Sequence, residues 1–390
     1  MTARMTPHRP ASLRLDAAHG RNGVVMVLVL WFILLIFVIA VSLSYTLTIG
    51  VQMTSHGRKA LKASGLARAA IGKAVIDLKN DRLMAAADPN YNIDTLADVW
   101  ALTEDKTDIE YGDGIYTVRI IDDNRKLDLN TISPINRVAL EYLLTEYCDV
   151  DPDVAVEMVN ALIDYIDADS VSQADPTIEE SEYYTEFVLD EFGDLYGEGY
   201  YFLPRNEPLL SEHELINIPG FTHEVLFGYA EDTPDDLIER IDSEEVSYAL
   251  IDYVTVNSGG TVNINTAPRP LIEAMLAAAS GNLGDERNWA GNIIDLREDL
   301  MEQSDAGARG IMDMSQLPMS GLPETVLNNL TSMFQLRPTS RFFTIVARGE
   351  VDGIRETRSL RVYVELQRYP LDDEFEYGRG RRDIVPFGVL

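Results

Sequence analysis

Carboxylates gather in the first half of the chain, at the end of a predicted helix and in the polar segment that follows it. Asp164 and Asp167 are three residues apart, so a helix would place both side chains on one side. Asp169 follows at once, and Glu182 lies further along with two more glutamates just before it. Oxygen ligands without nearby histidine or cysteine suit Ca²⁺, which takes roughly six to eight of them. The residues alone allow either a calcium site or an acidic loop exposed to solvent.

The spacing of these carboxylates is not that of an EF-hand. Counted from Asp167, the sixth position is Ser172, where the EF-hand loop needs glycine. The twelfth position is Ile178, where a bidentate glutamate belongs. Any calcium site here must therefore use a different loop geometry.

The sequence holds no familiar catalytic arrangement: no G-x-S-x-G elbow, no Walker loop and no H-E-x-x-H. The single cysteine, Cys148, lies in an apolar helical pattern typical of a packed thiol and excludes an intrachain disulfide. His213 and His223 flank a predicted turn at Gly220 without a partner nucleophile. An anchored metal-dependent hydrolase would also need an activating base or an open metal position. We predict that the protein is not an enzyme.

The charge balance disfavours nucleic acid as a partner. The chain has 32 Lys and Arg against 64 Asp and Glu, which gives a formal net charge of −32. Phosphate binding needs a basic stripe that releases counterions, and the body of the sequence has none. Divalent cations or basic protein surfaces suit such a polyanion better.

An unbroken apolar run from Val24 to Val41 can span a bilayer as a helix. Four arginines precede it against one acidic residue: Arg4, Arg9, Arg14 and Arg21 against Asp16. The positive-inside preference therefore keeps the N-terminus cytoplasmic and places the acidic bulk outside. The run is too long for the core of a secretory signal peptide, and its helical pattern continues, so we expect one helix over residues 24–80.

The start of this helix resembles the signal of type IV prepilins, a basic leader that ends in glycine before an apolar helix. Arg21, Asn22, Gly23 and Val24 carry the match. The resemblance implies cleavage after Gly23 by a prepilin peptidase, N-methylation of Val24 and removal of residues 1–23. The fifth mature position, which is glutamate in most pilin-like proteins, is Leu28 here. A carboxylate buried in lipid needs a paired amine, so its absence indicates no subunit ahead to pair with.

Beyond the long helix, the alternation in residues 114–130 predicts a strand, and residues 341–367 predict a hairpin with a turn at Asp352 and Gly353. The residues between are mostly helical by pattern. We expect an α+β fold: a pilin-like domain with a small antiparallel sheet (51–128 and 340–368), the transmembrane part of the helix (24–50), an inserted all-helical domain (129–339) and a flexible tail (369–390).

Short helix-turn-helix units recur in the predicted insert, at residues 210–230, 264–278 and 314–330. They are similar to helix-hairpin-helix motifs of a SAM-like domain, whose turn amides often contact DNA phosphate. The same geometry is a plain packing unit, and the turns lack lysine and arginine, which favours packing. The alternative is a membrane-anchored helix-hairpin-helix protein that binds nucleic acid in a DNA-uptake pilus.

Five segments in fixed order resemble the general secretion pathway protein K family, the K-type minor pseudopilins of type II secretion. They are KLDLNT (126–131), LIDYIDADS (162–170), EYY (182–184), LPRNEPLLSEHELINIPGF (203–221) and VNINTAP (262–268). The resemblance, which includes the Leu28 position, extends over most of residues 24–367. Tyr165, where the family often has tryptophan, and the acidic stretch at 186–199 depart from the pattern.

The resemblance implies a pseudopilin at the tip of the pseudopilus, which initiates or caps its assembly for protein export across the outer membrane. It implies single-pass anchoring in the inner membrane, a periplasmic C-terminal part, and partners that include I-type and J-type minor pseudopilins and the major pseudopilin. It also implies calcium in the inserted domain, with the four carboxylates of Asp164, Asp167, Asp169 and Glu182 as candidate ligands.

Overall fold

A computed structural model describes eight ranges of the chain: 20–87, 93–102, 106–187, 201–228, 249–281, 284–302, 310–363 and 386–387. It divides into two compact units, Met1–Leu61 and Lys62–Leu390.

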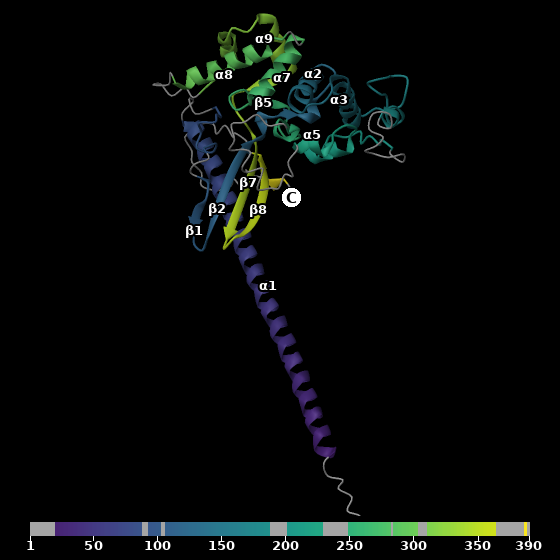
Figure 1. The fold of residues 1–390 in the computed structure, drawn as a ribbon. Helices are drawn as coiled ribbons and strands as arrows, with labels where there is room; N and C mark the ends of the chain where they lie inside the picture. Colours follow the sequence, from purple (N-terminus) through teal and green to yellow (C-terminus); the bar gives the residue numbers. More distant parts are fainter. Residues whose placement is uncertain are drawn as a thin grey trace, which may run out of the picture. The chain divides into compact units, whose positions relative to one another are not determined.

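Helix α1 (Gly20–Ala87) confirms the long helix expected from the sequence (Figure 1). In the first unit its side chains from Val24 to Arg58 are exposed, and its most apolar stretch has a mean hydropathy of 3.5. Thr46, Thr48 and Thr54 turn their hydroxyls back onto the carbonyl four residues earlier, at 2.8–2.9 Å. Because these hydroxyls are satisfied within the helix, they do not interrupt its apolar character. α1 is therefore long and apolar enough to cross a membrane.

In the second unit an antiparallel sheet has the order β1-β2-β7-β8-β9 (Figure 1). Its strands are β1 (Ile109–Tyr111), β2 (Gly114–Asp122), β7 (Phe342–Val351), β8 (Ile354–Tyr363) and β9 (Pro386–Phe387). β2 pairs with β7 from Ile115 opposite Glu350 to Asp122 opposite Phe343. β7 and β8 form the predicted hairpin, whose turn at Asp352 and Gly353 has positive φ at both residues.

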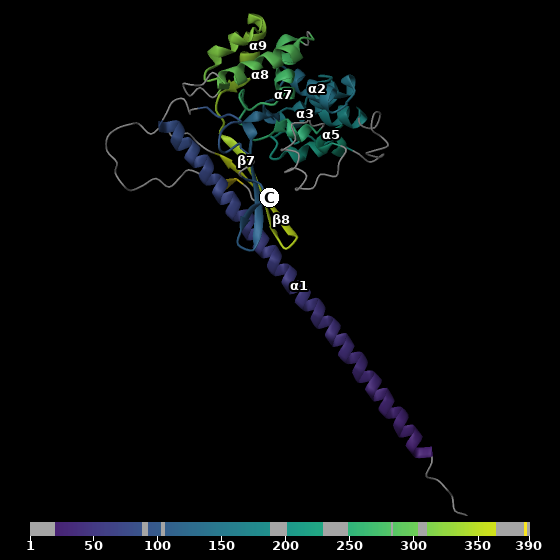
Figure 2. The same cartoon turned by 60° about the vertical axis from the view of Figure 1, so that its left-hand side comes forward.

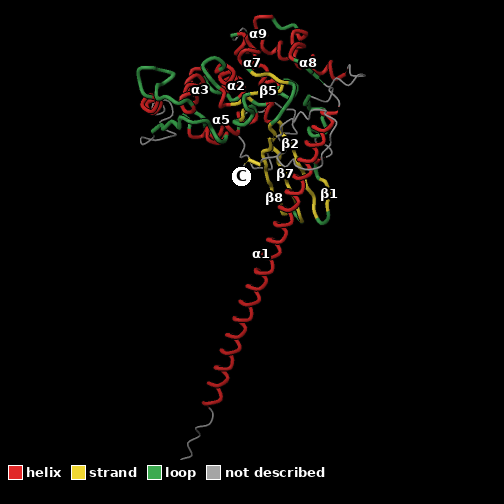
Figure 3. Tube along the Cα trace, turned by 180° about the vertical axis from the view of Figure 1, so that it is seen from behind, coloured by secondary structure: helices red, strands yellow, loops and turns green. Residues whose placement is uncertain are grey.

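The part of α1 from Lys62 onward runs along this sheet (Figure 3). It packs on the sheet through small side chains. Four alanines at helical spacing are at most 1% exposed: Ala63, Ala67, Ala70 and Ala74. A Cβ atom at Gly349 of β7 would overlap the Ala63 carbonyl oxygen. Trp100 and Phe343 close the same core edge to face, with ring centroids 5.1 Å apart. Small residues thus set how closely helix and strand approach.

Between β2 and β7 the described chain is mostly helical, and its helices lie together (Figure 2). They share one large apolar core. They are α2 (Arg137–Tyr147), α3 (Pro152–Ile166), α5 (His223–Phe227), α7 (Arg269–Ser280), α8 (Glu286–Glu302) and α9 (Glu324–Met333), with 3₁₀ turns η3 (Asp123–Arg125), η4 (Leu129–Thr131), η5 (Glu212–Asn217), η6 (Leu250–Asp252) and η7 (Met314–Ser320). Two pairs of short parallel strands lie among them: β3 (Leu127–Asp128) with β4 (Val254–Thr255), and β5 (Thr261–Asn263) with β6 (Gln335–Arg337).

The strand predicted over residues 114–130 is shorter than expected. β2 ends at Asp122, whose side chain accepts a hydrogen bond from the Asn124 amide and starts η3. Asp128 does the same for η4 through the Asn130 amide. The two aspartates break the extended backbone by capping local turns. The predicted tail 369–390 lies outside the described residues except for β9.

Candidate functional site

The acidic cluster lies where α3 ends and the chain loops back. Asp167 is the C-cap residue of α3, and Asp169 follows in the loop. A single bridge between Val171 and Glu179 folds the loop onto itself, so that Glu180 returns to the end of α3. One carboxylate oxygen each from Asp167, Asp169 and Glu180 lies within 4.8 Å of the other two. Three carboxyl groups therefore converge on one small volume.

Glu180 is the unusual member of this group. Its residue is 1% exposed, and neither carboxylate oxygen has a hydrogen-bond partner in the described structure. Burial, together with repulsion from Asp164, Asp167 and Asp169, raises the pKa of Glu180 to about 8. A buried carboxylate with no donor is costly, because nothing replaces its lost hydration. A cation bound by these oxygens would remove that cost.

Asp164 fixes the loop that follows α3. It is fully buried, and its two oxygens accept hydrogen bonds from the Gln173 amide at 3.2 and 2.9 Å. Burial raises its pKa to about 6, against the hydrogen bonds, and the neighbouring carboxylates add to the rise. Asp164 therefore ties the loop to α3 and adds negative charge next to the cluster.

A loop distant in sequence contacts the backbone next to the cluster. The Asn206 side-chain amide donates to the Asp169 carbonyl oxygen at 2.5 Å, and its backbone amide donates to the Tyr165 carbonyl oxygen at 2.9 Å. The Oδ1 atom of Asn206 is buried and has no hydrogen-bond partner among the described residues. With a φ of 53°, Asn206 also holds a left-handed conformation, which asparagine tolerates better than most residues.

The donor set fits a hard cation. The three converging groups are all carboxylates, and neither histidine nor cysteine takes part. Of the residues predicted from the sequence, Asp167 and Asp169 come together and Asp164 lies beside them. Glu182 is exposed and is not in the group.

The sequence pattern did not single out Glu180 or Asn206. Glu180 is one of several nearby glutamates, and only the position of the Val171–Glu179 bridge decides which of them turns inward. Asn206 lies far along the chain, in the LPRNEP segment of the family resemblance, and no local spacing connects it to α3.

The turns at Gly220 and Gly321 belong to two of the predicted helix-turn-helix units. They differ in exposure, and neither resembles a phosphate-binding site. Gly220 is buried against Met158, and its φ is 82°. The Phe221 amide after it donates to Ile218 within the turn, so it is not free to bind a phosphate. The second turn, at Gly321, is exposed but leads into α9 at Glu324, whose negative charge opposes phosphate.

Cys148, His213 and His223 have packing roles. Cys148 is 8% exposed, and burial raises its pKa to about 12, so the thiol stays protonated and unreactive. His213 and His223 both pack against the Phe227 ring, with centroid distances of 5.5 and 4.8 Å. The His213 contact joins η5 to α5, and the His223 contact lies within α5.

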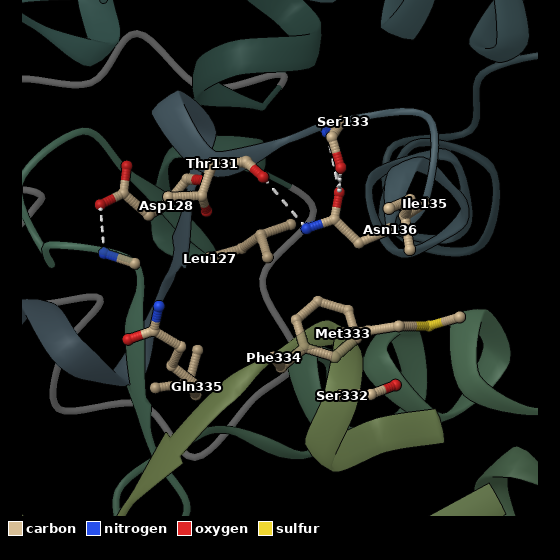
Figure 4. Close-up of a pocket in the computed structure, with 12 residues that line it drawn as sticks. Leu127, Asp128, Thr131, Ser133, Ile135, Asn136, Ser332, Met333, Phe334 and Gln335 are labelled. Atoms are coloured by element: carbon tan, nitrogen blue, oxygen red, sulfur yellow. Dashed lines mark hydrogen bonds between the residues drawn. The ribbon is translucent and has the colours of Figure 1, made fainter. Parts of the chain in front are cut away.

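A hollow of about 220 Å³ lies beside the β3 and β5 strands (Figure 4). Apolar groups of Leu127, Val262 and Phe334 line it together with several short polar side chains. Those polar groups are used locally: Asn136 bonds to Ser133 and to the Thr131 carbonyl oxygen, and Asp128 accepts from the Gly260 amide. The lining has no nucleophile beside a base.

No protein-family model and no curated protein sequence matches the chain. Among solved structures, the chain is similar to one in the crystal structure of the GspK-GspI-GspJ complex from the type 2 secretion system of enterotoxigenic Escherichia coli. The similarity covers 77% of this chain and 94% of that chain, at 17% sequence identity and a TM-score of 0.45. It is a distant likeness.

Proposed function

We propose that this chain is a membrane-anchored minor pseudopilin of the K type, with a structural role at the tip of a type II secretion pseudopilus. The observation that carries the proposal is α1. Its N-terminal part is apolar and exposed, and its later part presents an alanine row to the β2-β7-β8 sheet. An anchor helix that also forms the spine of a small sheet domain is the arrangement a pilin-like subunit needs.

The start of the chain supports the same proposal. Cleavage after Gly23 would leave Val24 as the methylated first residue, and Leu28 would stand where pilin-like subunits have glutamate. A subunit without that carboxylate has no need of the N-terminal amine of another subunit ahead of it. The helical region between β2 and β7 adds bulk beyond the sheet, which favours a position at the end of the assembly. The chain would be anchored in the inner membrane, with its acidic part in the periplasm.

We further propose that the cluster of Asp167, Asp169 and Glu180 binds calcium, with Asn206 as a neutral oxygen ligand. The unpartnered oxygens of Glu180 support this assignment. Bound Ca²⁺ would neutralise the converging charges and join the loop after α3 to the segment that holds Asn206. Its role would be to hold these loops in place.

The experiment is co-purification of the full chain in detergent with candidate I-type and J-type minor pseudopilins, combined with N-terminal sequencing of the processed protein. We expect a stable ternary complex and a mature chain that begins at Val24. A different first residue, or no association with or without calcium, would refute the proposal.

The alternative is a helix-hairpin-helix protein that binds nucleic acid. Burial of the Gly220 turn and the acidic residue after Gly321 weigh against it. Binding of the purified chain to labelled DNA at low salt would favour the alternative.

A further inference from the structure

A buried polar cluster joins the end of α1, the sheet and the helical region. We call it the junction cluster: Arg82 in α1, Asp94 after α1, Asp122 at the end of β2, Asn263 and Thr266 at and after β5, and Ser340 before β7. All six residues are at most 9% exposed. These residues come from five separate parts of the chain, so their contacts depend on the assembled fold.

Ser340 connects the two carboxylates of the cluster. Its backbone amide donates to Asp94 Oδ2 at 2.6 Å, and its hydroxyl donates to Asp122 Oδ2 at 2.5 Å. Thr266 also reaches Asp122 Oδ2 at 2.5 Å. Asn263 donates through Nδ2 to Ser340 Oγ at 2.7 Å and to the Asp94 carbonyl oxygen at 3.0 Å.

The charges of the cluster do not balance when both carboxylates are ionised. Arg82 pairs with Asp94, with Nη1 2.9 Å from Oδ1, and its Nη2 donates to the Ser340 carbonyl oxygen at 2.6 Å. Among the described residues Asp122 has no ion pair of this kind, although Arg125 in η3 lies near enough to interact with its charge. Asp98, which interacts with Asp94, adds negative charge, and the contacts from β5 and its following turn are uncharged. One surplus negative charge is therefore buried at Asp122.

The hydrogen bonds leave room for one proton at Asp122. The Ser340 hydroxyl accepts from Asn263 and so must donate its own proton to Asp122 Oδ2. The Thr266 hydroxyl has a second acceptor, the Asn263 carbonyl oxygen at 3.5 Å. When Asp122 is protonated on Oδ2, it can donate to Thr266 Oγ1 while Thr266 turns its own proton to Asn263. The cluster then has one arginine and one ionised carboxylate.

The geometry points to Asp122 as a proton-controlled latch between the sheet and the helical region: the protonated cluster holds the junction closed, and loss of the proton favours an open, hydrated junction. The energetic cause is the surplus charge that ionisation of Asp122 creates next to Asp94 in a buried site. An open junction would rehydrate Asp122 and release the contacts of Thr266 and Ser340.

The titration of Asp122 agrees with this geometry. Burial raises its pKa to about 7, against the hydrogen bonds of Ser340 and Thr266, and the Asp94 charge adds to the rise. A carboxyl whose pKa is raised in the closed state stabilises that state fully at low pH. The stabilisation is lost as pH rises from about 4 to 7, and above pH 7 it stays absent.

The test is hydrogen exchange, followed by mass spectrometry, on the full chain in detergent micelles between pH 5 and 8.5. Wild type is compared at each pH with Asp122→Asn, which has no proton to lose and whose amide can donate to Thr266. In the ratio of the two exchange rates, intrinsic base catalysis cancels. In peptides that contain Thr266 and Ser340, we expect this ratio to rise up to about tenfold per pH unit until pH 7 and then to level off.

Two further variants make the result decisive. Asp313→Asn removes an exposed carboxyl that caps η7, and its ratio to wild type should not change with pH over this range. Thr266→Val removes one hydrogen bond to the ionised form, so the midpoint of its exchange profile should move to higher pH. It also supplies the measurement if Asp122→Asn does not fold. A ratio for Asp122→Asn that is constant with pH, or an unchanged midpoint for Thr266→Val, would overturn the latch.

Discussion

Replacing Glu180 by glutamine tests whether the acidic cluster binds a cation. Without a cation, the raised pKa of Glu180 means that its carboxyl stabilises the fold only while it is protonated. That stabilisation is present below about pH 4.5 and is lost as pH rises to about 8. Glutamine keeps the shape and removes the charge. Without calcium at pH 8, Glu180→Gln should therefore be more stable than wild type.

The size of the effect follows from the same pKa. One pKa unit corresponds to about 1.4 kcal/mol, so a change from 4.5 to about 8 corresponds to a maximum of about 5 kcal/mol. Local relaxation and water entry lower this value, and we expect about 2–4 kcal/mol at pH 8. With calcium, wild type should be more stable than Glu180→Gln, because calcium binds the ionised carboxylate and releases its proton. Its stabilisation of wild type should be larger at pH 8 than at pH 5.

The assay is thermal unfolding at pH 5 and pH 8, in chelator and in calcium, for wild type and two variants. The control is Glu182→Gln, which removes an exposed carboxylate two residues away. Wild type and the control should gain stability from calcium, and Glu180→Gln should gain little. If the control loses the calcium response and Glu180→Gln keeps it, Glu182 is the ligand and the assignment of Glu180 is wrong.

Three other predictions concern packing and reactivity. Gly349→Val should destabilise the second unit by about 3 kcal/mol or more in denaturant unfolding, because a Cβ there meets the α1 backbone. The control Gly72→Ala, in open space on α1, should not lower the free energy of unfolding. Trp100→Ala should cost about 3–5 kcal/mol by the same assay, because it leaves a cavity against Phe343, and a loss below 1 kcal/mol would contradict that packing. Cys148 should resist alkylation at pH 8 in the native chain and react after denaturation; fast native labelling would mean that the thiol is exposed.

The elements with strong periodicity could be predicted from the sequence. α2, α3 and α7 lie in the region that the pattern of apolar residues predicted to be mostly helical. The β7–β8 hairpin turns where Asp352 and Gly353 predicted it. These features depend on local pattern alone. The long helix was predictable for the same reason, although its extension to Ala87 was not.

What the sequence could not supply depends on contacts between distant segments. Asp122 looks like one more polar residue of a strand until Ser340 and Thr266 are placed around it. The same is true of Glu180, whose inward direction follows from a bridge across the loop, and of Asn206, which reaches Asp169 from a different part of the chain. Local spacing identifies the type of residue at such a site, but not which of several nearby residues of that type takes part.

The pairing of Asp122 with Phe343 has a consequence for how this fold can change. The chain leaves the sheet at one position and, after about two hundred residues, re-enters it at the directly opposite position. Asn124 Oδ1 accepts hydrogen bonds from the Arg341 and Phe342 amides, which fastens the exit to the return. A short hairpin loop could join the same two positions without moving either strand, because loop closure costs less for a shorter connection. In evolutionary terms, the helical region is an insertion that such a sheet domain could gain, lose or exchange in a single step.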